Sequence, residues 1–318
     1  MRLSRLVFFG TPEFALPTLQ ALCAAGRAPL LVVARPDRPA GRGQRQRTPP
    51  VAAWARQQGL EVAQPASVRD AELQQRLGAL APDLAVVVAF GQIFPRELLA
   101  LPRHGCVNVH ASLLPRHRGA APVQAALRAG DERTGVTTMV MEEGLDSGPI
   151  LLAAETELSG RETAGELAPR LAHLGAAALL ETVDRLQAGT VAPRPQEDAE
   201  ATYAPRLRKE DGRVDWARTA RQLFDQLRAV TPWPGLHAEL RGEPLRIHWA
   251  EVVEGGEGVA GGESPPGALL GLADGRLRVA CGDGTVLGLE RLQRPGRRPV
   301  DAPDFANGER LAAGERLA

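Results

Sequence analysis

The segment Gly105–Pro122 holds the densest group of side chains that could carry out chemistry. If Cys106–His110 is a strand, Asn108 and His110 lie on the same face of it, because side chains alternate between the two faces. An amide can donate a hydrogen bond to a developing oxyanion, and an imidazole can move a proton near neutral pH. The pair therefore suits acyl transfer, although a purely structural Asn-x-His at a strand end remains an equally open interpretation here.

A second loop, Gly144–Gly148, adds an acidic side chain flanked by glycines. It follows the apolar run Val136–Met141, which predicts a strand. Glycines on both sides allow the backbone to turn tightly and to come close to a ligand. Asp146 could orient His110 and favour its protonated form, but an Asp in a glycine-rich loop is more often only a turn former.

Other kinds of site lack their sequence patterns. The turn Gly10-Thr11-Pro12 after the first apolar run is not a Gly-x-Gly-x-x-Gly dinucleotide fingerprint, and the chain has no Gly-x-x-x-x-Gly-Lys-Ser/Thr nucleotide loop. It also has no Gly-x-Ser-x-Gly elbow, which argues against a serine hydrolase. His104 and His117 lack metal-ligand spacing with a cysteine or an acid, so we expect no metal site.

The elements that must position these residues can be traced through the first half of the chain. Leu6–Phe9, Leu30–Ala34 and Leu84–Phe90 are continuous apolar runs, typical of central parallel strands covered on both faces. Helical stretches separate them, and this alternation predicts an α/β fold with a doubly wound, Rossmann-like N-terminal domain. Such sheets carry their sites outside the carboxyl ends of the strands, where Asn108 and His110 fall.

The composition changes at Gly189, and the residues that follow carry no periodic apolar pattern but include prolines, which predicts a linker. With 318 residues, about twice a typical domain, the chain has room for two domains. We predict a catalytic domain at 1–189, a linker at 190–208 and a second domain at 209–318.

The second domain is predicted to be a small OB-like β-barrel. Apolar residues between Trp216 and Leu227 repeat on one helical face, and Asp215 is a candidate cap for that helix. From Leu236 onward short alternating runs are separated by turn residues such as Asp274-Gly275. A helix followed by several hairpins is typical of a small barrel.

Positive charge is concentrated in two segments of a chain that is neutral as a whole. Lys+Arg and Asp+Glu both number 38, so the net charge is zero, and no apolar run approaches the roughly 18 residues that a membrane span needs. Five arginines against one aspartate nevertheless fall between Arg35 and Arg47, in a loop that Pro and Gly keep from being helical. Such a cluster is usually a solvated face, but its position after the second strand makes phosphate binding equally plausible. Arg206, Arg208 and Lys209 form a second basic patch.

The three cysteines, Cys23, Cys106 and Cys281, are far apart in sequence and odd in number. This pattern fits neither a disulfide framework nor a Cys-x-x-Cys metal site. It indicates free thiols and a reducing, cytoplasmic location.

Several motifs together resemble the folate-dependent formyltransferases, and within them the branch that acts on methionyl-tRNA. The resemblance covers nearly the whole chain, and it departs from the family pattern at His117, where an aromatic residue is common. The matching motifs are Phe9-Gly-Thr-Pro-Glu-Phe14, Pro36-Asp-Arg-Pro-Ala-Gly-Arg-Gly43, Val88-Ala-Phe-Gly91, the run Asn108–Pro122, Gly144-Leu-Asp-Ser-Gly148, Asp215-Trp216 and Pro232-Trp-Pro234.

The resemblance implies transfer of a formyl group from the co-substrate 10-formyltetrahydrofolate to the α-amino group of methionine on initiator tRNA, for translation initiation. It assigns catalysis to Asn108, His110 and Asp146, with no metal, in an enzyme that we expect to be monomeric. It places the folate against Ser112, Leu113, Leu114, Pro115, Phe90, Gly91 and Ile93. For the tRNA we expect contacts from Arg38, Arg42, Arg45, Arg47, Arg206, Arg208 and Lys209, with Arg42 the strongest candidate.

Three alternatives stay open at this point. A sugar-nucleotide N-formyltransferase would use the same Asn108, His110 and Asp146 on a different amine, although the arginine-rich loop favours tRNA. A catalytically idle tRNA- or folate-binding protein would not need all three residues. A nicotinamide dehydrogenase is disfavoured because its glycine fingerprint is missing.

Overall fold

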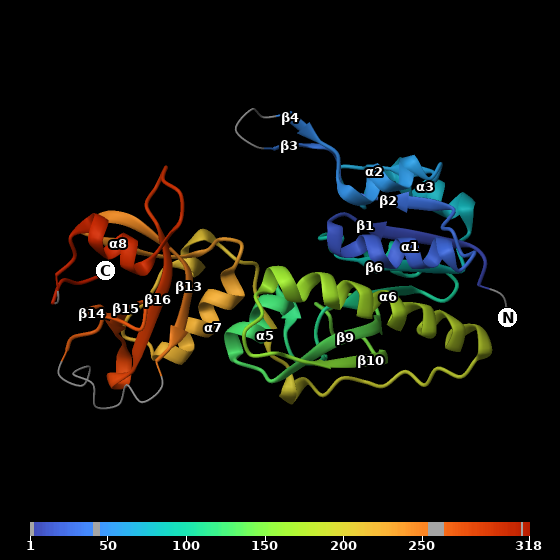
Figure 1. Ribbon diagram of the computed structural model, residues 1–318. Coiled ribbons are helices and arrows are strands. Elements are labelled where there is room, and N and C mark those ends of the chain that lie inside the picture. The colour runs from blue at the N-terminus through green and yellow to red at the C-terminus, as the bar shows by residue number, and fades with distance from the viewer. Residues whose placement is uncertain (1–2, 41–44, 254–263, 313) are drawn as a thin grey trace. The chain divides into compact units, whose positions relative to one another are not determined.

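The structure, a computed structural model, describes residues 3–40, 45–253, 264–312 and 314–318 (Figure 1). The chain forms two compact units, each assembled from three stretches of sequence. Unit 1 contains Met1–Pro122, Arg133–Glu157 and Ala168–Pro205, and unit 2 contains Val123–Glu132, Leu158–Leu167 and Arg206–Ala318. The predicted boundaries at 189 and 209 stay a prediction.

Unit 1 is built on a seven-stranded sheet with the order β10-β9-β7-β6-β1-β2-β5. The pairs from β5 to β7 are parallel, whereas β9 runs antiparallel to both β7 and β10. This confirms the predicted Rossmann-like α/β fold. The strands are β1 (Leu6–Gly10), β2 (Leu31–Val33), β5 (Val62–Ala63), β6 (Leu84–Val88), β7 (Cys106–His110), β9 (Arg133–Val140) and β10 (Ile150–Glu157).

Helices cover both faces of this sheet. All five residues of β1 and all five of β6 are buried, as expected for strands whose successive side chains point to opposite covered faces. The α3 helix begins at Asp70, whose carboxylate accepts a hydrogen bond from the Leu73 amide at 2.9 Å. The helices of this part of the chain are α1 (Leu16–Ala24), α2 (Pro50–Gln57), α3 (Ala71–Leu80), α4 (Arg96–Leu99) and α6 (Ala164–Ala188).

The strand order reverses direction at β1. The chain moves outward from β1 to β2 and β5, then returns to β6 on the other side of β1 and continues to β7. Ligand sites of doubly wound sheets form at such a switch point, beyond the carboxyl ends of the strands. Phe9, at the end of β1, packs edge-to-face against Phe90 and Phe94, with ring centroids 5.4 and 4.9 Å away. These rings fix the start of the loop that follows β6.

Two short ribbons flank the main sheet of unit 1. The strands β3 (Arg38–Ala40) and β4 (Arg45–Arg47) form an antiparallel pair in which Arg38 lies opposite Arg47. The strands β8 (Arg118–Gly119) and β11 (Tyr203–Ala204) pair in parallel.

Unit 2 contains an antiparallel sheet with the order β12-β13-β16-β15-β14, to which β17 adds beside β16. The last residues of the chain pair with both ends of this order, Leu240 with Leu317 and Ala268 with Arg316, so the sheet closes on itself. The predicted barrel fold of this region is therefore confirmed. The strands are β12 (Leu236–Leu240), β13 (Glu243–Val252), β14 (Leu269–Ala273), β15 (Arg276–Ala280), β16 (Val286–Gln293) and β17 (Val300–Asp301).

Helices complete unit 2, namely α5 (Pro122–Ala129, of which all but Pro122 belongs to this unit), α7 (Ala220–Val230) and α8 (Ala302–Glu309). The helix expected after Asp215 begins later, at α7, and Asp215 does not cap it. Thr219 is the cap instead, and it exchanges hydrogen bonds with Gln222 in a capping box. The cap is therefore four residues past the predicted one, because Thr219 and Gln222 have the spacing that a capping box requires.

Candidate active site

The strand β7 presents Asn108 and His110 at the carboxyl edge of the unit 1 sheet. Asn108 lies between Val87 of β6 and Met139 of β9, and His110 lies opposite Thr137 of β9. Asn108 is half-buried and His110 is 6% exposed. The two side chains therefore occupy one face of a central strand, as their spacing predicts.

The His110 ring faces two oxygen atoms. Its Nε2 atom lies 2.9 Å from the carbonyl oxygen of His117, so Nε2 carries a hydrogen and donates it. Its Nδ1 atom lies 3.6 Å from Oδ2 of Asp146, which is longer than a direct hydrogen bond. An oxygen atom therefore faces each of the two ring nitrogens.

The Asp146 carboxylate is held by backbone. Its Oδ2 atom accepts a hydrogen bond from the Gly119 amide at 2.8 Å, and Asp146 itself has a positive φ of 50°. A left-handed conformation is tolerated better by Asp than by most other residues. The loop after β9 and the loop after β7 thus meet at this carboxylate, and the three predicted catalytic residues lie on adjoining strands or the loops that follow them.

Within residues 3–40, 45–253, 264–312 and 314–318, the side-chain amide of Asn108 makes no hydrogen bond. An amide that is half-buried and free has its donor available for a ligand atom. Thr138 and Thr182, on β9 and α6, illustrate the opposite case, because their hydroxyl groups bond each other at 2.7 Å.

The loop Ser112–Pro115, predicted to contact folate, is braced from within. The Ser112 hydroxyl donates to the carbonyl of Arg116 at 2.6 Å and is fully buried. Thr137 donates to the carbonyl of Ser112 at 2.7 Å and accepts from the amide of Leu114 at 3.1 Å. Leu114 packs in a small cluster with Met139 and Ile150. Leu113 and Pro115 are half-buried and retain surface for a ligand.

The segment after β6, also predicted to contact folate, divides into a core residue and exposed ones. Phe90 is 3% exposed and belongs to the aromatic cluster, so its side chain serves the core. Gly91 has a φ of 76° and an exposed backbone, and its carbonyl accepts from Arg35 Nη1 at 3.4 Å. Ile93 is 76% exposed, and Leu145 beside Asp146 is 58% exposed.

An ion pair joins the two segments that carry these exposed apolar side chains. Arg96 Nε lies 4.0 Å from a carboxylate oxygen of Glu143, which joins the segment after β6 to the Asp146 loop. Two large apolar side chains exposed on adjoining loops fit an apolar, planar ligand portion.

The described part of the chain contains no group of three or more His, Cys, Asp or Glu side chains arranged to hold a metal ion. In the same stretches no helix is long and apolar enough to cross a membrane.

The described strands of the arginine-rich segment, β3 and β4, pair as a two-stranded hairpin. Arg38 and Arg47 are both exposed and lie directly opposite each other, which places like charges side by side. Asp37, at the base, accepts hydrogen bonds from Gln64 and Thr48, and these bonds lower the pKa of its carboxyl group. The backbone of Arg45 lies on β4, and Arg42 lies outside the described residues.

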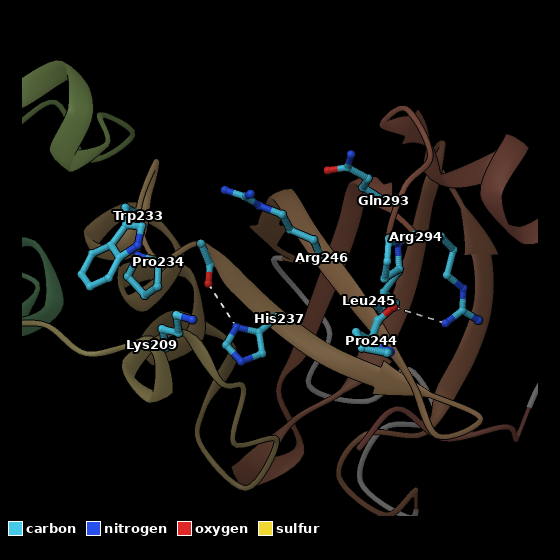
Figure 2. A pocket seen from close by; sticks show the side chains of 11 residues that line it. Lys209, Trp233, Pro234, His237, Pro244, Leu245, Arg246, Gln293 and Arg294 are labelled. Carbon is cyan, nitrogen blue, oxygen red and sulfur yellow. Dashed lines mark hydrogen bonds between the residues drawn. The ribbon is translucent and has the colours of Figure 1, made fainter. Parts of the chain in front are cut away.

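The second basic patch belongs to unit 2. Arg206, Arg208 and Lys209 are exposed, and Lys209 lines a pocket of about 460 Å³ in the barrel (Figure 2). Trp233, 54% exposed, and Arg246 line the same pocket, and the lining set includes no Asp or Glu. Cations beside an exposed indole suit a nucleic-acid strand, whose phosphates are anionic and whose bases stack on aromatic rings.

Sequence reasoning missed several residues that contact the site loops. Gln196 and Thr202 lie in the segment predicted as a linker, yet Gln196 donates to the carbonyl of Asp146 and Thr202 accepts from the amide of His117. Arg118 belongs to a recognised motif, but its burial at 4% exposure was not predicted. Side chain-to-backbone contacts of this kind have no periodic signature, so a single sequence offers no signal for them.

Known proteins resemble both parts of the chain. Residues 4–183 match the family described as formyl transferase, and residues 206–310 match the family described as formyl transferase, C-terminal domain. A methionyl-tRNA formyltransferase of Stutzerimonas stutzeri (strain A1501) is 51% identical over 306 residues, which cover 96% of this chain and 95% of the relative.

Solved structures share the fold at low identity. An N-formyltransferase from Helicobacter canadensis in complex with folinic acid and dTDP-3-aminofucose matches with a TM-score of 0.66 at 14% identity, covering 90% of this chain and 98% of that one. HypX from Aquifex aeolicus in complex with tetrahydrofolic acid matches with a TM-score of 0.60 at 16% identity over 99% of this chain. This chain spans about half of the HypX chain, 49% of its length.

Proposed function

This chain belongs to the formyl transferase family, and we propose that it transfers the formyl group of 10-formyltetrahydrofolate to the α-amino group of methionyl initiator tRNA. The high identity to a methionyl-tRNA formyltransferase over 96% of the chain supports this substrate. A sugar-nucleotide acceptor is less well supported, because the sugar-modifying relative matches at only 14% identity.

The observation that carries the proposal is the meeting of Asn108, His110 and Asp146 at the carboxyl edge of the sheet. Formyl transfer to an amine passes through a tetrahedral intermediate with an oxyanion, and it requires that a proton leave the amine. The amide of Asn108 has a free donor for the oxyanion, and His110 has the ring and the acidic neighbour for the proton.

The amine can attack without a covalent enzyme intermediate. An α-amino group has a pKa of about 7.7–8.0, so a useful fraction is neutral near pH 7. Its nitrogen forms a bond to the formyl carbon while the carbonyl π electrons move to oxygen, where Asn108 donates a hydrogen bond. Collapse of the intermediate restores the carbonyl and breaks the bond between carbon and N10 of the folate.

The proton balance assigns the transfer to His110. The attacking amine loses one proton and N10 gains one, so the step needs a group that accepts and then donates. In our proposal the Nδ1 side of His110 and the Asp146 carboxylate, 3.6 Å apart, carry this proton, directly or through a water. The bond from Nε2 to the His117 carbonyl keeps the ring oriented throughout.

The folate fits the loops after β6 and β9. We place its pterin against the turn at Gly91 and the loop of Asp146, and against the backbone of Ser112–Pro115. The exposed Ile93 and Leu145 offer apolar surface for the rings, which supports this placement. The Phe90 and Ser112 side chains are turned into the protein, so we assign only their backbone to the ligand.

We assign tRNA contacts to the cations of both units. In unit 1 these are Arg38 and Arg47 of the hairpin, with Arg42 and Arg45 between them in the chain. In unit 2 they are Arg206, Arg208 and Lys209. Local positive charge supports both assignments, and so does the exposure of the described side chains, which are those of Arg38, Arg47, Arg206, Arg208 and Lys209.

Three further properties complete the proposal. We propose that the enzyme needs no metal, because a neutral amine, an amide donor and a histidine suffice for the chemistry. We propose that it acts as a monomer, since one chain supplies the three catalytic residues, and that it works in the cytoplasm, where aminoacyl-tRNA is formed. Light scattering on the purified protein tests the oligomeric state.

A competition assay tests the function. The purified protein is given 10-formyltetrahydrofolate with either methionyl initiator tRNA or a nucleotide-linked amino sugar, after treatment with a chelator. We expect formyl-methionyl-tRNA as the product, with no loss after chelation. Formylation of the amino sugar alone would overturn the proposed acceptor, and loss of activity that is restored by a metal would overturn the metal-free mechanism.

A further inference from the structure

The chain returns from the end of α6 beside β10 (Figure 1), and residues 194–204 contact the two loops that carry the proposed catalytic residues. Arg194 pairs with Ile150 at the start of β10 through two backbone hydrogen bonds of 2.8 and 2.9 Å. Further along, the Thr202 carbonyl accepts from the amide of Arg118 at 2.8 Å, and β11 pairs with β8. The segment is therefore attached on both sides of the Asp146 loop.

Between these attachments the side chain of Gln196 reaches the Asp146 turn itself. Its Nε2 atom donates to the carbonyl of Asp146 at 2.9 Å and to the carbonyl of Gly148 at 2.7 Å. An amide NH2 group has two hydrogens, so both are used on this one turn. Asp146 has a positive φ of 50°, so these two bonds, together with the Gly119 amide, hold the turn in a left-handed conformation that most residues disfavour.

The orientation of the Gln196 amide is fixed from its other end. Its Oε1 atom accepts from Nε of Arg118 at 3.0 Å, and Arg118 is 4% exposed. A guanidinium has only donors, so the oxygen must face Arg118 and the NH2 group must face the two carbonyls. Asp198 accepts from Nη2 of Arg118 at 2.8 Å and completes the chain of contacts.

We propose that Gln196 is a positioning residue, which holds the Asp146 turn so that the carboxylate faces His110 during formyl transfer. The inference rests on the proposed function. The Asp146 carboxylate is anchored to Gly119, and the turn that carries it is anchored to Gln196, so the distance to His110 Nδ1 depends on both. A displacement of about 1 Å of a catalytic group can cost a factor of about 10² in rate.

Two variants of Gln196 separate its hydrogen bonds to the Asp146 turn from its hydrogen bond to Arg118. Gln196→Met removes the donors and the acceptor at similar volume, whereas Gln196→Glu keeps an acceptor for Arg118 and removes the donors. We expect kcat to fall about 10- to 100-fold in both, with KM for methionyl-tRNA changed by less than about threefold. Gln74→Met is the matched control, because Gln74 is half-buried and bonds a single carbonyl, that of Val68, at 3.3 Å.

A double-mutant cycle with Asp146→Asn provides a readout that general destabilisation would not produce. If Gln196 acts through Asp146, Gln196→Met costs little further activity in the Asp146→Asn background. The pH profile of kcat should likewise change in the same way in the two single variants. Equal losses in both backgrounds, or full activity of both Gln196 variants, would overturn the inference.

The outcomes also distinguish this inference from the proposed function. Full activity of Asp146→Asn, or no formyl transfer by the unaltered protein, would overturn the catalytic assignment and this inference with it. An inactive Asp146→Asn beside fully active Gln196 variants would overturn the inference alone. Thermal unfolding checks that each variant is folded, and the Glu variant remains a test where the Met variant fails to fold.

Discussion

Selected positions in each unit show polar and charged side chains in two different circumstances. In unit 2, Asp225 is 5% exposed and bonds both Arg221 and the almost fully buried Arg228, and Arg276 bonds Glu251 and Glu290. In unit 1, the amide of Asn108 has no partner among the described residues, and Arg38 faces Arg47. Paired groups stabilise the fold, whereas open groups keep their hydrogen-bonding capacity and charge for a ligand.

This difference predicts opposite consequences of substitution at the two kinds of position. Removing one member of a pair in unit 2 should lower the free energy of unfolding and leave the chemistry intact. Removing an open group in unit 1 should lower catalysis or binding and leave the fold intact. The following predictions test this separation, beginning with the largest effect.

The Asp225→Asn substitution should give the largest loss of stability. It leaves the Arg228 guanidinium buried without its counter-charge, and breaking a buried pair typically costs about 3–5 kcal/mol. Chemical denaturation measures the loss, and kcat below the unfolding transition should be unchanged. Asp274→Asn is the control, because the Asp274 carboxylate is 78% exposed and its pair with Arg278 should contribute less than about 1 kcal/mol. Equal losses in the two variants would contradict the contrast.

The Asn108→Ala substitution should show the reverse pattern. Loss of one oxyanion donor typically costs about 2.7–4 kcal/mol of barrier, so kcat should fall about 10²- to 10³-fold. Because the amide has no partner among the described residues, the midpoint of unfolding should change little. Asn307→Ala, at an exposed position of α8, is the matched control. An Asn108→Ala enzyme with unaltered kcat would remove this residue from the mechanism.

The hairpin predicts an effect on binding alone. Replacing Arg38 and Arg47 together by Gln should raise KM for methionyl-tRNA and reduce the slope of log K against log salt by about 2, because each arginine is expected to neutralise about one phosphate. Stability should hold or rise slightly, because two like charges no longer face each other. Replacing Arg133 and Arg185 by Gln removes the same charge from arginines paired with glutamates. An equal effect of that control pair would mean that only net charge matters.

The sequence predicted most directly those site residues that lie close to one another in the chain. Asn108 and His110 share a strand, so alternation alone placed them together. Asp146 follows a different strand, so its role beside His110 was one of two interpretations until the family resemblance assigned it to catalysis. The folate contact of Phe90 stays a prediction, and its ring serves the core, because burial depends on residues such as Phe9 that are distant in sequence.

The fold was predicted from periodic patterns of apolar residues and from turn residues. The contacts that were missed have no periodic pattern in the sequence. Continuous apolar runs identified the buried strands, and turn residues identified the hairpins of the barrel. Thr219 and Gln196 act through single hydrogen bonds to particular backbone atoms, and Gln196 meets Asp146 across 50 residues of sequence. Such contacts are set by the tertiary fold and not by local propensity.

The smallest predicted effect is on the pH dependence of stability, and it concerns one buried thiol in each unit. Burial raises the pKa of Cys106 to about 12 and that of Cys281 to about 12. A thiol whose folded-state pKa exceeds its unfolded value of about 8.5 contributes stability below that value, and the contribution is lost as pH rises from there toward the folded pKa. Between pH 8 and 10 the free energy of unfolding should therefore fall by about 1–2 kcal/mol for each thiol.

Variants of the cysteines test this pH dependence. Cys106→Ala and Cys281→Ala should each flatten the decline of stability between pH 8 and 10, whatever their stability at pH 7. Cys23 is half-buried and burial raises its pKa less, so Cys23→Ala should change the slope less than either. Denaturant titrations at several pH values give the slopes, and three equal slopes would contradict the prediction.

The assembly of unit 2 from three stretches of sequence has a consequence for dissection. Arg128 pairs with Asp211 at 3.3 Å, and the amide of Gly165 donates to the carbonyl of Thr231 at 3.1 Å, so parts of the first half of the chain are built into this unit. No single proteolytic cut can release the barrel together with the two earlier stretches of sequence that belong to unit 2. A fragment starting at Arg206 would lack the partners of Asp211 and Thr231. Refolding experiments on such a fragment would therefore measure the stability of an incomplete unit 2.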